Sequence, residues 1–580
     1  MCRRLIAISI FSWTSLVAQE GAAPTQKEEA VRTPRENVES TEFSLDSVIH
    51  LSVKNLKPPQ WYPDIVSWDP AVSANSKEVQ MHVSQGIALI HAGWDFEAYR
   101  HFVEAVKKDP ECLMAYWGIA LSLAGPNSEV VECRLAAVRR MIDLVTQGKG
   151  TVSEQGQAEA MAFVFSEQPE RAPEVFAAVS EKYPNNLQLK LMASFLKRDG
   201  YDDLFGPRMG QREALEEVEE ILKNNTESQM ALSFWIALQA EHPDATGKVR
   251  KTVLPRVRRL VSYSPDFPTY CERMAHFEKR SGNLALAKIE YEKAIRIYNE
   301  KLAEDGLSYY DCPNLIRAKL ALAHTLMSLD DFDGAFAIAK ELSELEIKPE
   351  RLYSPGATLV LWEGRTLGAR LTLVRGLKSD LKRGLATLPK REEGEKLAFE
   401  TPAVMAWESW RHALSCRDAL AAEDFELAHN YLSALEVSDG LLGRVKSVVS
   451  SGSSRQVWLR TRKALKVEWM LSKSALIQAQ MGEKSARESK FWAQSAIDER
   501  ETPEGIFAPL SFSLPPLNKA LLLSQLGDKE GAHESFKIAM ADYANNIHIL
   551  KSYEEFLRSD SQTESADKIK NHIQVLLKQS

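Results

Sequence analysis

The clearest pattern along the chain is a set of small and large apolar side chains at fixed offsets in residues 84–127. Gly86 and Ala98 are small residues twelve positions apart, and Phe102 follows Ala98 by about one helical turn. Small side chains let two antiparallel helices approach closely, and an aromatic ring fills the gap that they leave. Gly93 lies where a tight turn between the helices favours a residue without a Cβ. The pattern predicts two antiparallel helices joined at Gly93.

The end of this pattern has a signal of its own. Ala105 continues the small positions of the second helix, and Pro110 ends that helix because proline cannot donate the next backbone hydrogen bond. These offsets match a tetratricopeptide (TPR) repeat, a helix–turn–helix unit of about 34 residues. TPR arrays present surfaces that hold partners, and their fold supplies no chemistry of its own.

The same spacing returns in five further segments in a less complete form. In each copy the second small residue follows the first by twelve positions, a constancy that is hard to obtain by chance. The copies are carried by Ala160, Ala172, Phe176, Val179 and Pro184; by Ala275, Gly282, Ala287, Tyr291 and Ala294; by Ala323, Ala335, Ala339 and Leu342; by Cys416, Ala428, Leu432 and Leu435; and by Ala520, Gly527, Asp528, Ala532, Phe536 and Ala539. No alternating run predicts a β-strand. The chain is therefore predicted to be all-α, a TPR-like α-solenoid of antiparallel helix pairs.

Three stretches interrupt the helical pattern. Residues 56–72 hold four prolines together with Trp61 and Tyr62, which predicts an extended segment packed over the first repeat. Residues 439–455 combine glycines with a serine cluster and are predicted to form a mobile connection. Residues 500–517 carry four prolines and apolar side chains, so we expect this loop to pack against the concave or edge surface of the array.

The N-terminus predicts export. Arg3 and Arg4 precede a short apolar core from Leu5 to Val17, and Ala18 offers a small residue for cleavage, as in a secretory signal peptide. A core of about 13 residues is too short to span a membrane of roughly 30 Å. We expect an exported protein, periplasmic or extracellular, with no stable membrane insertion after cleavage.

These features divide the chain into five parts. They are a signal peptide at 1–18, a disordered leader at 19–45, and TPR-like arrays at 46–250, 251–450 and 451–580. The net charge of −8 supplies no general attraction for nucleic acid, so none is expected as a partner.

Metal and cofactor motifs are absent from the sequence. The twelve histidines are dispersed, and no HExxH, CxxC, P-loop or dinucleotide-binding motif occurs. His82, His91 and His101 lie nine and ten positions apart, which does not place them on one ligand-forming turn. His276 and Cys271 could meet on a helix, but two loose ligands do not make a site. We expect no metal site, no cofactor and no catalytic residue, and hence no enzyme.

The cysteines of the mature chain are few and scattered. Export would permit a pair such as Cys112–Cys133, but buried thiols are the commoner outcome. The five residues concerned are Cys112, Cys133, Cys271, Cys312 and Cys416.

Two other groups of side chains allow two interpretations each. The basic segment KVRKTVLPRVRRL could receive an acidic partner or a phosphorylated glycan, but we favour a solvated helix face whose arginine stems cover apolar surface. Its cations are Lys248, Arg250, Lys251, Arg256, Arg258 and Arg259. A set of aromatic residues could stack on sugars, but their helical spacing favours the core. These are Trp94, Tyr99, Tyr116 and Trp117, and further along Trp407 and Trp410.

The motif DPECLMAYWGIALSLAGPN resembles the signature of a bacterial family of exported TPR proteins, D-P-x-C-x-M-x-Y-W-G-x-A followed by G-P-N. The matching residues are Asp109, Pro110, Cys112, Met114, Tyr116, Trp117, Gly118, Ala120, Gly125, Pro126 and Asn127. The resemblance is specific over residues 84–127 and implies a multi-repeat α-solenoid with no established catalytic activity. The family's histidine-rich segments are missing here, since only His276 remains in FPTYCERMAHFEKRSGN. Any metal or ligand chemistry of those histidines is therefore not carried over to this chain.

The sequence favours an exported, non-catalytic TPR scaffold that binds a protein or peptide through its concave surface. The alternative is a periplasmic or extracellular receptor for a small molecule or glycan on the same helical scaffold, with a pocket closed by residues 500–517. A single sequence identifies neither the partner nor the oligomeric state.

Overall fold

The computed structural model describes residues 43–66, 72–124, 130–166, 168–202, 206–240, 249–348, 351–352, 354–395, 397, 402–445, 452–481, 485–499 and 510–579. The predicted signal peptide and all but the last three residues of the predicted leader lie outside these ranges. Within them the regular structure is helical, and the β structure is limited to an isolated bridge between Tyr201 and Pro207. The all-α prediction is confirmed.

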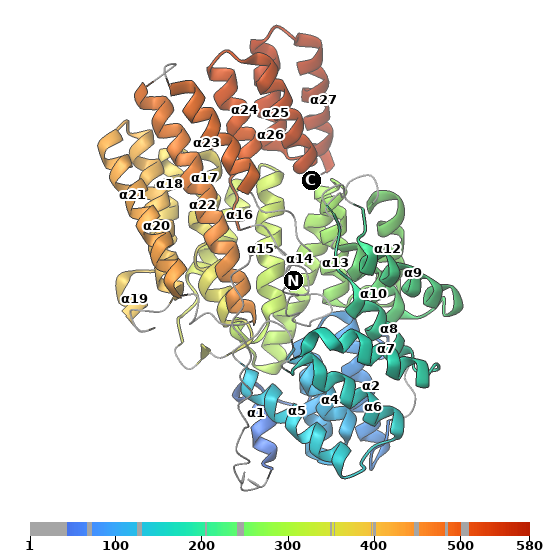
Figure 1. Cartoon of the computed structure of the whole chain (residues 1–580). Helices are drawn as coiled ribbons and strands as arrows, with labels where there is room; N and C mark the ends of the chain where they lie inside the picture. Colours follow the sequence, from blue (N-terminus) through green and yellow to red (C-terminus); the bar gives the residue numbers. More distant parts are fainter. Residues whose placement is uncertain are drawn as a thin grey trace, which may run out of the picture.

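The helices follow one another as antiparallel pairs (Figure 1). A short 3-10 turn, Leu45–Val48, and α1 (Leu51–Lys54) precede them. The first six pairs are α2 (Lys77–Ala92) with α3 (Asp95–Lys108), α4 (Leu113–Ser122) with α5 (Val131–Thr146), α6 (Val152–Val164) with α7 (Ala172–Lys182), α8 (Leu187–Lys197) with α9 (Met209–Asn224), α10 (Gln229–Ala240) with α12 (Leu254–Tyr263), and α13 (Pro268–Arg280) with α14 (Leu284–Asp305).

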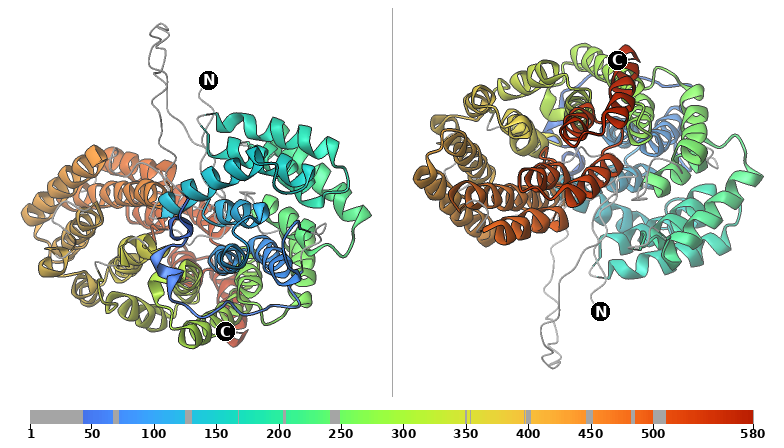
Figure 2. Two further views of the ribbon diagram at one scale, coloured as in Figure 1. Left: turned by 90° about the horizontal axis from the view of Figure 1, so that it is seen from below. Right: turned by 90° about the horizontal axis from the view of Figure 1, so that it is seen from above.

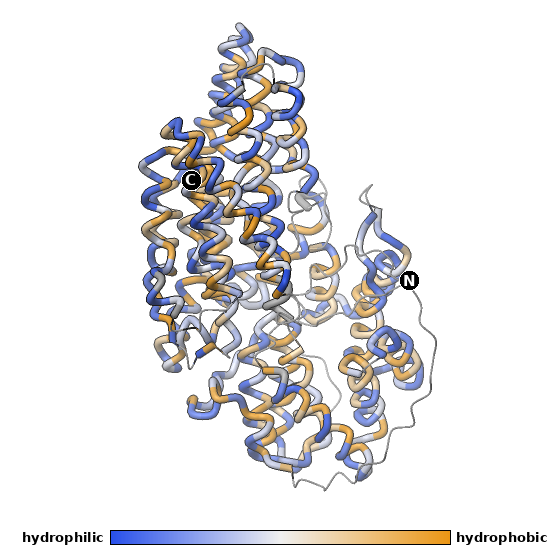
Figure 3. The backbone as a smooth tube through the Cα atoms, turned by 60° about the vertical axis from the view of Figure 1, so that its left-hand side comes forward, coloured by the Kyte–Doolittle hydropathy of each residue, from blue (hydrophilic) through white to orange (hydrophobic). Residues whose placement is uncertain are grey.

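The second half of the chain continues the arrangement. Its helices are α15 (Pro313–Ser328) with α16 (Phe332–Ser343), α17 (Leu367–Arg375) with α18 (Lys378–Thr387), the short α19 (Arg391–Glu395), α20 (Pro402–Ala421) with α21 (Phe425–Arg444), α22 (Gly452–Met481) with α23 (Ala486–Glu499), α24 (Pro515–Gln525) with α25 (Lys529–Asp542), and α26 (Ile547–Ser559) with α27 (Thr563–Gln579). Hydrophobic and hydrophilic residues alternate along most helices with the helical period (Figure 3).

The opening repeat packs as its spacing predicts. Gly93 adopts a left-handed conformation with φ of 87° at the turn between α2 and α3. A Cβ on Gly86 would lie 2.6 Å from Cζ of Phe102, and a Cβ on Gly118 would overlap the same ring. Phe102 and Ala98 are completely buried. The missing Cβ atoms therefore provide the space that the ring of Phe102 fills.

The five other copies of the spacing also lie at helix-pair contacts. Each pair of small residues twelve positions apart is buried, and the two residues lie on the two helices of one pair. The pairs are Ala160 and Ala172, Ala275 and Ala287, Ala323 and Ala335, Cys416 and Ala428, and Ala520 and Ala532. The predicted register of the TPR-like repeats is confirmed at all of them.

The array curves so that its first repeat meets its own middle (Figure 2). The turn that ends α2 is held by three side chains of α13 and α15. Thr269 donates to the carbonyl oxygen of Ala92 at 2.6 Å, and Asn314 donates to that of Gly93 at 3.2 Å. Arg273 donates to the carbonyl oxygen of the preceding residue, His91, at 3.0 Å.

The last repeat also returns to the middle of the array. Asn545 donates to the carbonyl oxygen of Gly282 at 2.8 Å, and Lys551 pairs with Asp330. Both contacts join the segment around α26 to the turns that follow α13 and α15. A small apolar cluster supports them, made of Leu284, Leu329, Ile547, Leu550 and Ile573.

Two of the predicted interruptions have different bounds in the structure. Of the predicted connection at 439–455, residues 439–444 belong to α21 and 452–455 to α22, so the prediction was wrong at both ends. Leu442 is buried, and its carbonyl oxygen accepts a bond from the indole of Trp458 at 2.9 Å. Packing between α21 and α22 therefore outweighs the low helix propensity of the glycines. Helix α24 begins at Pro515, inside the predicted loop at 500–517, because proline is well suited to the first turn of a helix.

Candidate functional site

The inner helices of the central array are buried on all sides. Every residue of α13 from Pro268 to Glu278 is buried, and so is every residue of α15 from Asn314 to Ser328. In the outer helix α14, by contrast, buried residues recur every three or four positions from Leu284 to Tyr298. From Pro268 to Glu278 of α13 and from Asn314 to Ser328 of α15, the polar side chains therefore lie inside the protein and do not line an open groove, whereas Lys279 and Arg280 at the end of α13 are half-buried.

Residues 56–66 cover part of this interior. The ring of Trp61 lies 4.7 Å from that of His82 and 5.0 Å from that of His101. Gln85 of α2 accepts from the backbone of Tyr62 at 3.1 Å. The predicted extended segment over the first repeat is confirmed for these residues, while 67–71 lie outside the described residues.

Two histidines that are distant in sequence meet beneath this segment. Nδ1 of His82 and Nδ1 of His101 are 3.1 Å apart. Since Nε2 of His101 contacts the carbonyl oxygen of Gln60 at 3.0 Å, it must donate there, and Nδ1 of His101 accepts from His82. Burial lowers the pKa of His101 to about 3. The spacing of His82 and His101 was interpreted for a single helix, so it did not predict this contact. The two residues lie on the facing helices α2 and α3.

A balanced group of buried charges joins α3 to α14. Arg100 lies 2.8 Å from Glu97 and also pairs with Asp305, and Lys301 lies 2.8 Å from Asp305. Arg100 also donates to the carbonyl oxygen of Lys57 at 2.9 Å. Two cations face two carboxylates, so this group neutralises itself and has the character of a structural contact.

A second group, with two buried histidines and a half-buried lysine, is not balanced. His276 and Lys279 lie three positions apart on one face of α13, and His324 lies on the neighbouring α15. Burial lowers the pKa of Lys279 from 10.5 to about 7. Burial also lowers the pKa values of both histidines. The charges of Arg280 and then Lys279 lower the pKa of His276 further, and the charge of Lys279 lowers that of His324. In the part of the chain that the structure describes, no carboxylate pairs with Lys279.

The end of the proline-rich loop packs against this group. Phe512 is buried, and its ring centre lies 5.4 Å from that of His324. Arg370 of α17 lies 5.4 Å from the ring of Phe512 and donates to the carbonyl oxygen of Leu510 at 3.2 Å. Residues 510–514 therefore pack on inner helices, as the sequence predicted for this loop, while 500–509 lie outside the described residues.

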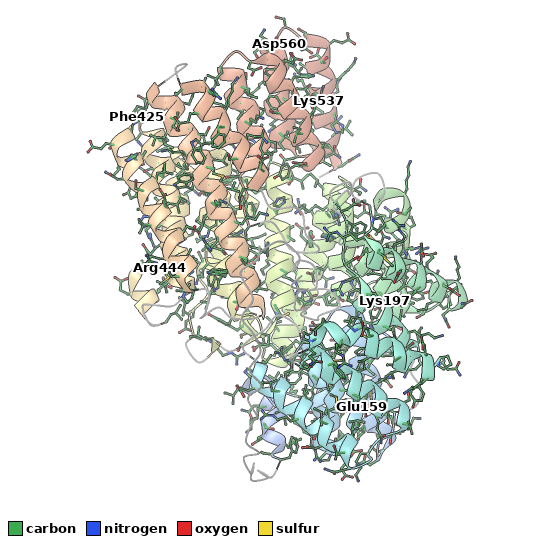
Figure 4. All side chains as sticks on the ribbon, viewed as in Figure 1. Glu159, Lys197, Phe425, Arg444, Lys537 and Asp560 are labelled. Atoms are coloured by element: carbon green, nitrogen blue, oxygen red, sulfur yellow. The ribbon has the colours of Figure 1, made fainter. Side chains whose placement is uncertain are left out.

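An exposed hollow lies between α9 and α10, with a volume of about 760 Å³. It is lined by Leu215, Glu216, Glu219, Glu220, Lys223, Asn224, Trp235 and Gln239. Two of these lining residues are contacted by Arg256 of α12, whose guanidinium forms two bonds of 2.7 and 2.8 Å to Glu219 and lies 3.9 Å from the ring centre of Trp235. Oε1 of Gln239 is buried without a hydrogen-bond partner. Lys197, which is labelled in Figure 4, is the last residue of α8 and pairs with Glu217 of α9.

The basic segment is largely neutralised by the protein itself. Arg256 pairs with Glu219, and Arg258 pairs with Glu278 at 2.8 Å. Arg259 pairs with Glu227 at 2.9 Å. Of the other three cations, Lys251 is exposed, Lys248 lies outside the described residues, and nothing is described of the Arg250 side chain. Arg256 does lie over an apolar surface, but the contact with the ring of Trp235 is made by its guanidinium.

The aromatic and cysteine residues named from the sequence lie in the core. Trp94, Tyr99, Tyr116, Trp117, Trp407 and Trp410 are all buried, so none of them offers a face to a sugar. All five cysteines are buried and free. Burial raises the pKa of Cys112 to about 12, which makes its thiol a poor nucleophile. Cys271 does not meet His276, since its thiol contacts the carbonyl oxygen of Pro265 at 3.3 Å.

Two searches of the described residues bear on metals and membranes. No group of three or more histidine, cysteine or carboxylate side chains gathers there as metal ligands do. None of the helices described is long and apolar enough to cross a bilayer.

Comparison with known proteins finds only distant structural similarities. No protein-family model matches the chain. No curated protein matches it. Among solved structures, the chain is similar to a human IFIT1 dimer with m7Gppp-AAAA, at 12% identity and a TM-score of 0.35, over 87% of this chain and 96% of that one. It is also similar to yeast Tom70, at 12% identity and a TM-score of 0.33, over 86% of this chain and 93% of that one. Scores this low carry no argument about function.

Sequence reasoning named His276 but missed Lys279 and His324. A signal was present for His324, since it lies with Arg317 and Lys319 in an otherwise apolar helix, PNLIRAKLALAHTLMS. A polar residue on the buried face of an inner helix needs a partner, and the absence of one is visible only in three dimensions.

Proposed function

We propose that this chain is a non-catalytic TPR-like scaffold that binds a protein or peptide partner. The sequence placed that partner on the concave surface of the inner helices. Since α13 and α15 are buried all round, we instead assign the partner to the exposed hollow between α9 and α10. The observation that supports this assignment is that two residues of its lining, Glu219 and Trp235, already hold the guanidinium of Arg256.

Arg256 acts as a built-in example of the chemistry that the hollow accepts. Its guanidinium is held by the carboxylate of Glu219 and lies over Trp235, the two contacts that arginine favours at interfaces. Glu216 and Glu220 lie beside this pair, are exposed, and have no ion-pair partner in the described part of the chain. They can receive further cations, so the partner is expected to present arginine or lysine side chains.

The test uses the full mature chain and a fluorescein-labelled peptide that carries two arginines two residues apart. Replacing Glu216 and Glu220 together by glutamine should weaken binding up to about thirtyfold, since each exposed ion pair contributes up to ~1 kcal/mol. Fluorescence anisotropy at low and high salt measures the change. A peptide with glutamine in place of arginine should not bind.

The matched control replaces Glu530 and Glu534 of α25 by glutamine. These two carboxylates have the same spacing and are exposed, but they lie far along the chain from the hollow. If the control weakens binding as much as the change at Glu216 and Glu220 does, the attraction is a general effect of net charge and the hollow is not the site.

Export and family membership belong to the same proposal. Their support is the N-terminal segment 1–18 and the signature from Asp109 to Asn127. Fusion of residues 1–60 to alkaline phosphatase should give an active, exported enzyme, with cleavage after Ala18 visible by mass spectrometry. An inactive fusion that stays in the cytoplasm would contradict export.

The alternative function, a receptor for a small molecule, is favoured by a different observation. Its support is that Lys279, half-buried at the end of α13, has no carboxylate partner in the described part of the chain. The named aromatic residues give no support to a glycan at this site, because they are buried in the core.

A further inference from the structure

One glutamine in the hollow between α9 and α10 has an unused hydrogen-bond acceptor. Gln239 lines the hollow and is only 6% exposed. Its Oε1 is enclosed and has no hydrogen-bond partner among the residues that the structure describes. Buried polar atoms are nearly always paired, and an unpaired one destabilises the fold. An unpaired acceptor in the lining of a hollow therefore indicates a donor that comes from outside the chain.

The pairing of α9 with α10 places a carboxylate near this glutamine. Nε2 of Gln211 donates to the carbonyl oxygen of Leu238 at 3.0 Å, which sets the register of the two antiparallel helices. In this register Glu216 lies about one helical turn from the level of Gln239. Glu216 is exposed and lines the hollow as well. Trp235 and Gln239 are four positions apart, so they share one face of α10.

From this arrangement we infer that the hollow binds an arginine side chain of the partner and selects it over lysine, and that Gln239 is the residue that makes the selection. The guanidinium donates to the carboxylate of Glu216 and, through another N–H, to Oε1 of Gln239. This inference rests on the proposed function, because it takes the hollow as the partner's binding site.

Rotation of the Gln239 amide brings its acceptor to the partner. The last torsion of a glutamine side chain is broad, so Oε1 turns toward the hollow without leaving a favoured conformation. There it accepts from a donor that the carboxylate of Glu216 holds in place. The pair of acceptors lies on two different helices, so a ligand has to span them with two donors of one group.

The chemistry of the hollow favours arginine as this ligand. A guanidinium is planar and carries five N–H donors in a fixed fork, so one group meets a carboxylate and an amide oxygen at the same time. The lysine ammonium is a compact and strongly hydrated point charge. Leu215 and Trp235 supply an apolar part of the lining, on which the more weakly hydrated guanidinium is favoured. Arg256 already combines two such contacts within the chain, since its guanidinium meets Glu219 and Trp235 together.

The charges of the lining attract any cation, and Gln239 adds none to them. The carboxylates of the lining are Glu216, Glu219 and Glu220, and its ammonium is that of Lys223. Glu219 is paired with Arg256, so two carboxylates remain against one ammonium. The net negative charge draws arginine and lysine alike. A change at Gln239 therefore alters the choice between them and leaves the general attraction as it is.

The labelled peptide with two arginines and a copy with lysine at both positions test the inference on the full mature chain. The wild type should bind the arginine peptide about tenfold more tightly, the effect of one hydrogen bond to a charged group. Gln239→Leu should lower this affinity to that of the lysine peptide and leave the lysine peptide unaffected, as measured by fluorescence anisotropy. Without peptide, the melting temperature of Gln239→Leu should not fall, because the change removes an unpaired acceptor.

Gln478→Leu is the matched control. Oε1 of Gln478 on α22 is also buried without a hydrogen-bond partner in the described part of the chain, but this residue is not among those that line the hollow. The control should keep the wild-type preference. If the Gln239→Leu protein does not fold, Gln239→Met takes its place, because its unbranched side chain follows the same path. Equal binding of the two peptides to the wild type, or a preference that persists in the Gln239 variant, would overturn the inference and leave the proposed function standing. Binding of neither peptide would overturn both.

Discussion

The central array and the α24–α25 pair near the C-terminus have the same repeat spacing, but their helices are buried to different extents. Ala98 in the opening repeat and Ala532 in α25 are both completely buried at a helix-pair contact. The central inner helices α13 and α15 are then covered on their other faces as well, whereas the C-terminal helices leave apolar side chains exposed. These include Leu521, Val575 and Leu577. The spacing determines how two helices pair, and contacts distant in sequence determine what the rest of the helix meets.

The two regions also differ in how they hold charge. Around the opening repeat, Arg100 and Lys301 are buried with their carboxylates. In α26 and α27, the ion pairs of Arg558 with Glu554 and Asp567 lie at the surface. Burial makes the first set costly to break, and solvent screens the second.

Arg100→Leu should give the largest loss of stability. It leaves Glu97 and Asp305 buried with one cation between them, and breaking a buried ion pair costs about 3–5 kcal/mol. Urea denaturation followed by circular dichroism measures the loss. Arg558→Leu is the matched change in the C-terminal region and should leave the midpoint unchanged. Equal effects of the two would show that the buried group does not stabilise the opening repeat.

The change of Ala98 to leucine should overpack the opening repeat and cost about 1–3 kcal/mol. Ala532→Leu should cost a similar amount locally. Because the last repeats are joined to the rest by fewer buried contacts, its effect should appear as faster hydrogen exchange in α24–α27 while α2 and α3 stay protected. An unchanged melting temperature for Ala98→Leu would show that the register of the repeat is wrong.

Acid should loosen residues 56–66 from the first repeat. The pKa of His101 is about 3 in the folded protein and about 6.5 in the unfolded chain, so the unfolded chain binds more protons between these values. The stability that the neutral His101 contributes to the folded protein is complete above pH 6.5. It declines by about 1.4 kcal/mol per pH unit as pH falls below that value. Denaturation at pH 7.5 and 5.0 should differ by roughly 2 kcal/mol more in the wild type than in His101→Gln. His572→Phe, at an exposed residue of α27, is the control and should keep the wild-type pH dependence.

The smallest effect is expected where the last repeat meets the middle of the array. Asn545→Gly keeps the left-handed backbone at this position (φ of 60°), removes the side-chain bonds to Gly282 and His572, and should cost about 1 kcal/mol. Its readout is hydrogen exchange in α26 and α27, which should accelerate without a change in α13. Combining this change with Lys551→Met should accelerate the exchange further. No acceleration in the double variant would show that these polar contacts do not hold the last repeat.

The helix pairs could be predicted from the sequence, and most of the interior could not. The spacing that links Gly86, Ala98 and Phe102 is local and repeats, so it can be read along one chain. The meeting of His82 with His101 depends on two facing helices, and the prediction treated each helix alone. Helix α21 runs through Gly440 and Gly443 because packing against α22 outweighs their propensity, which residue type alone does not show.

By itself, the sequence determined an all-α array of antiparallel helix pairs and the residues at which each pair closes, because these contacts repeat at short range. Only the tertiary structure decided that the first repeat lies against α13 and α15, and that most polar side chains of those helices are enclosed. It also decided that Lys301 has carboxylate partners and Lys279 has none. The physical reason is that burial and pairing of charge depend on segments hundreds of residues apart, which no periodicity along the chain encodes.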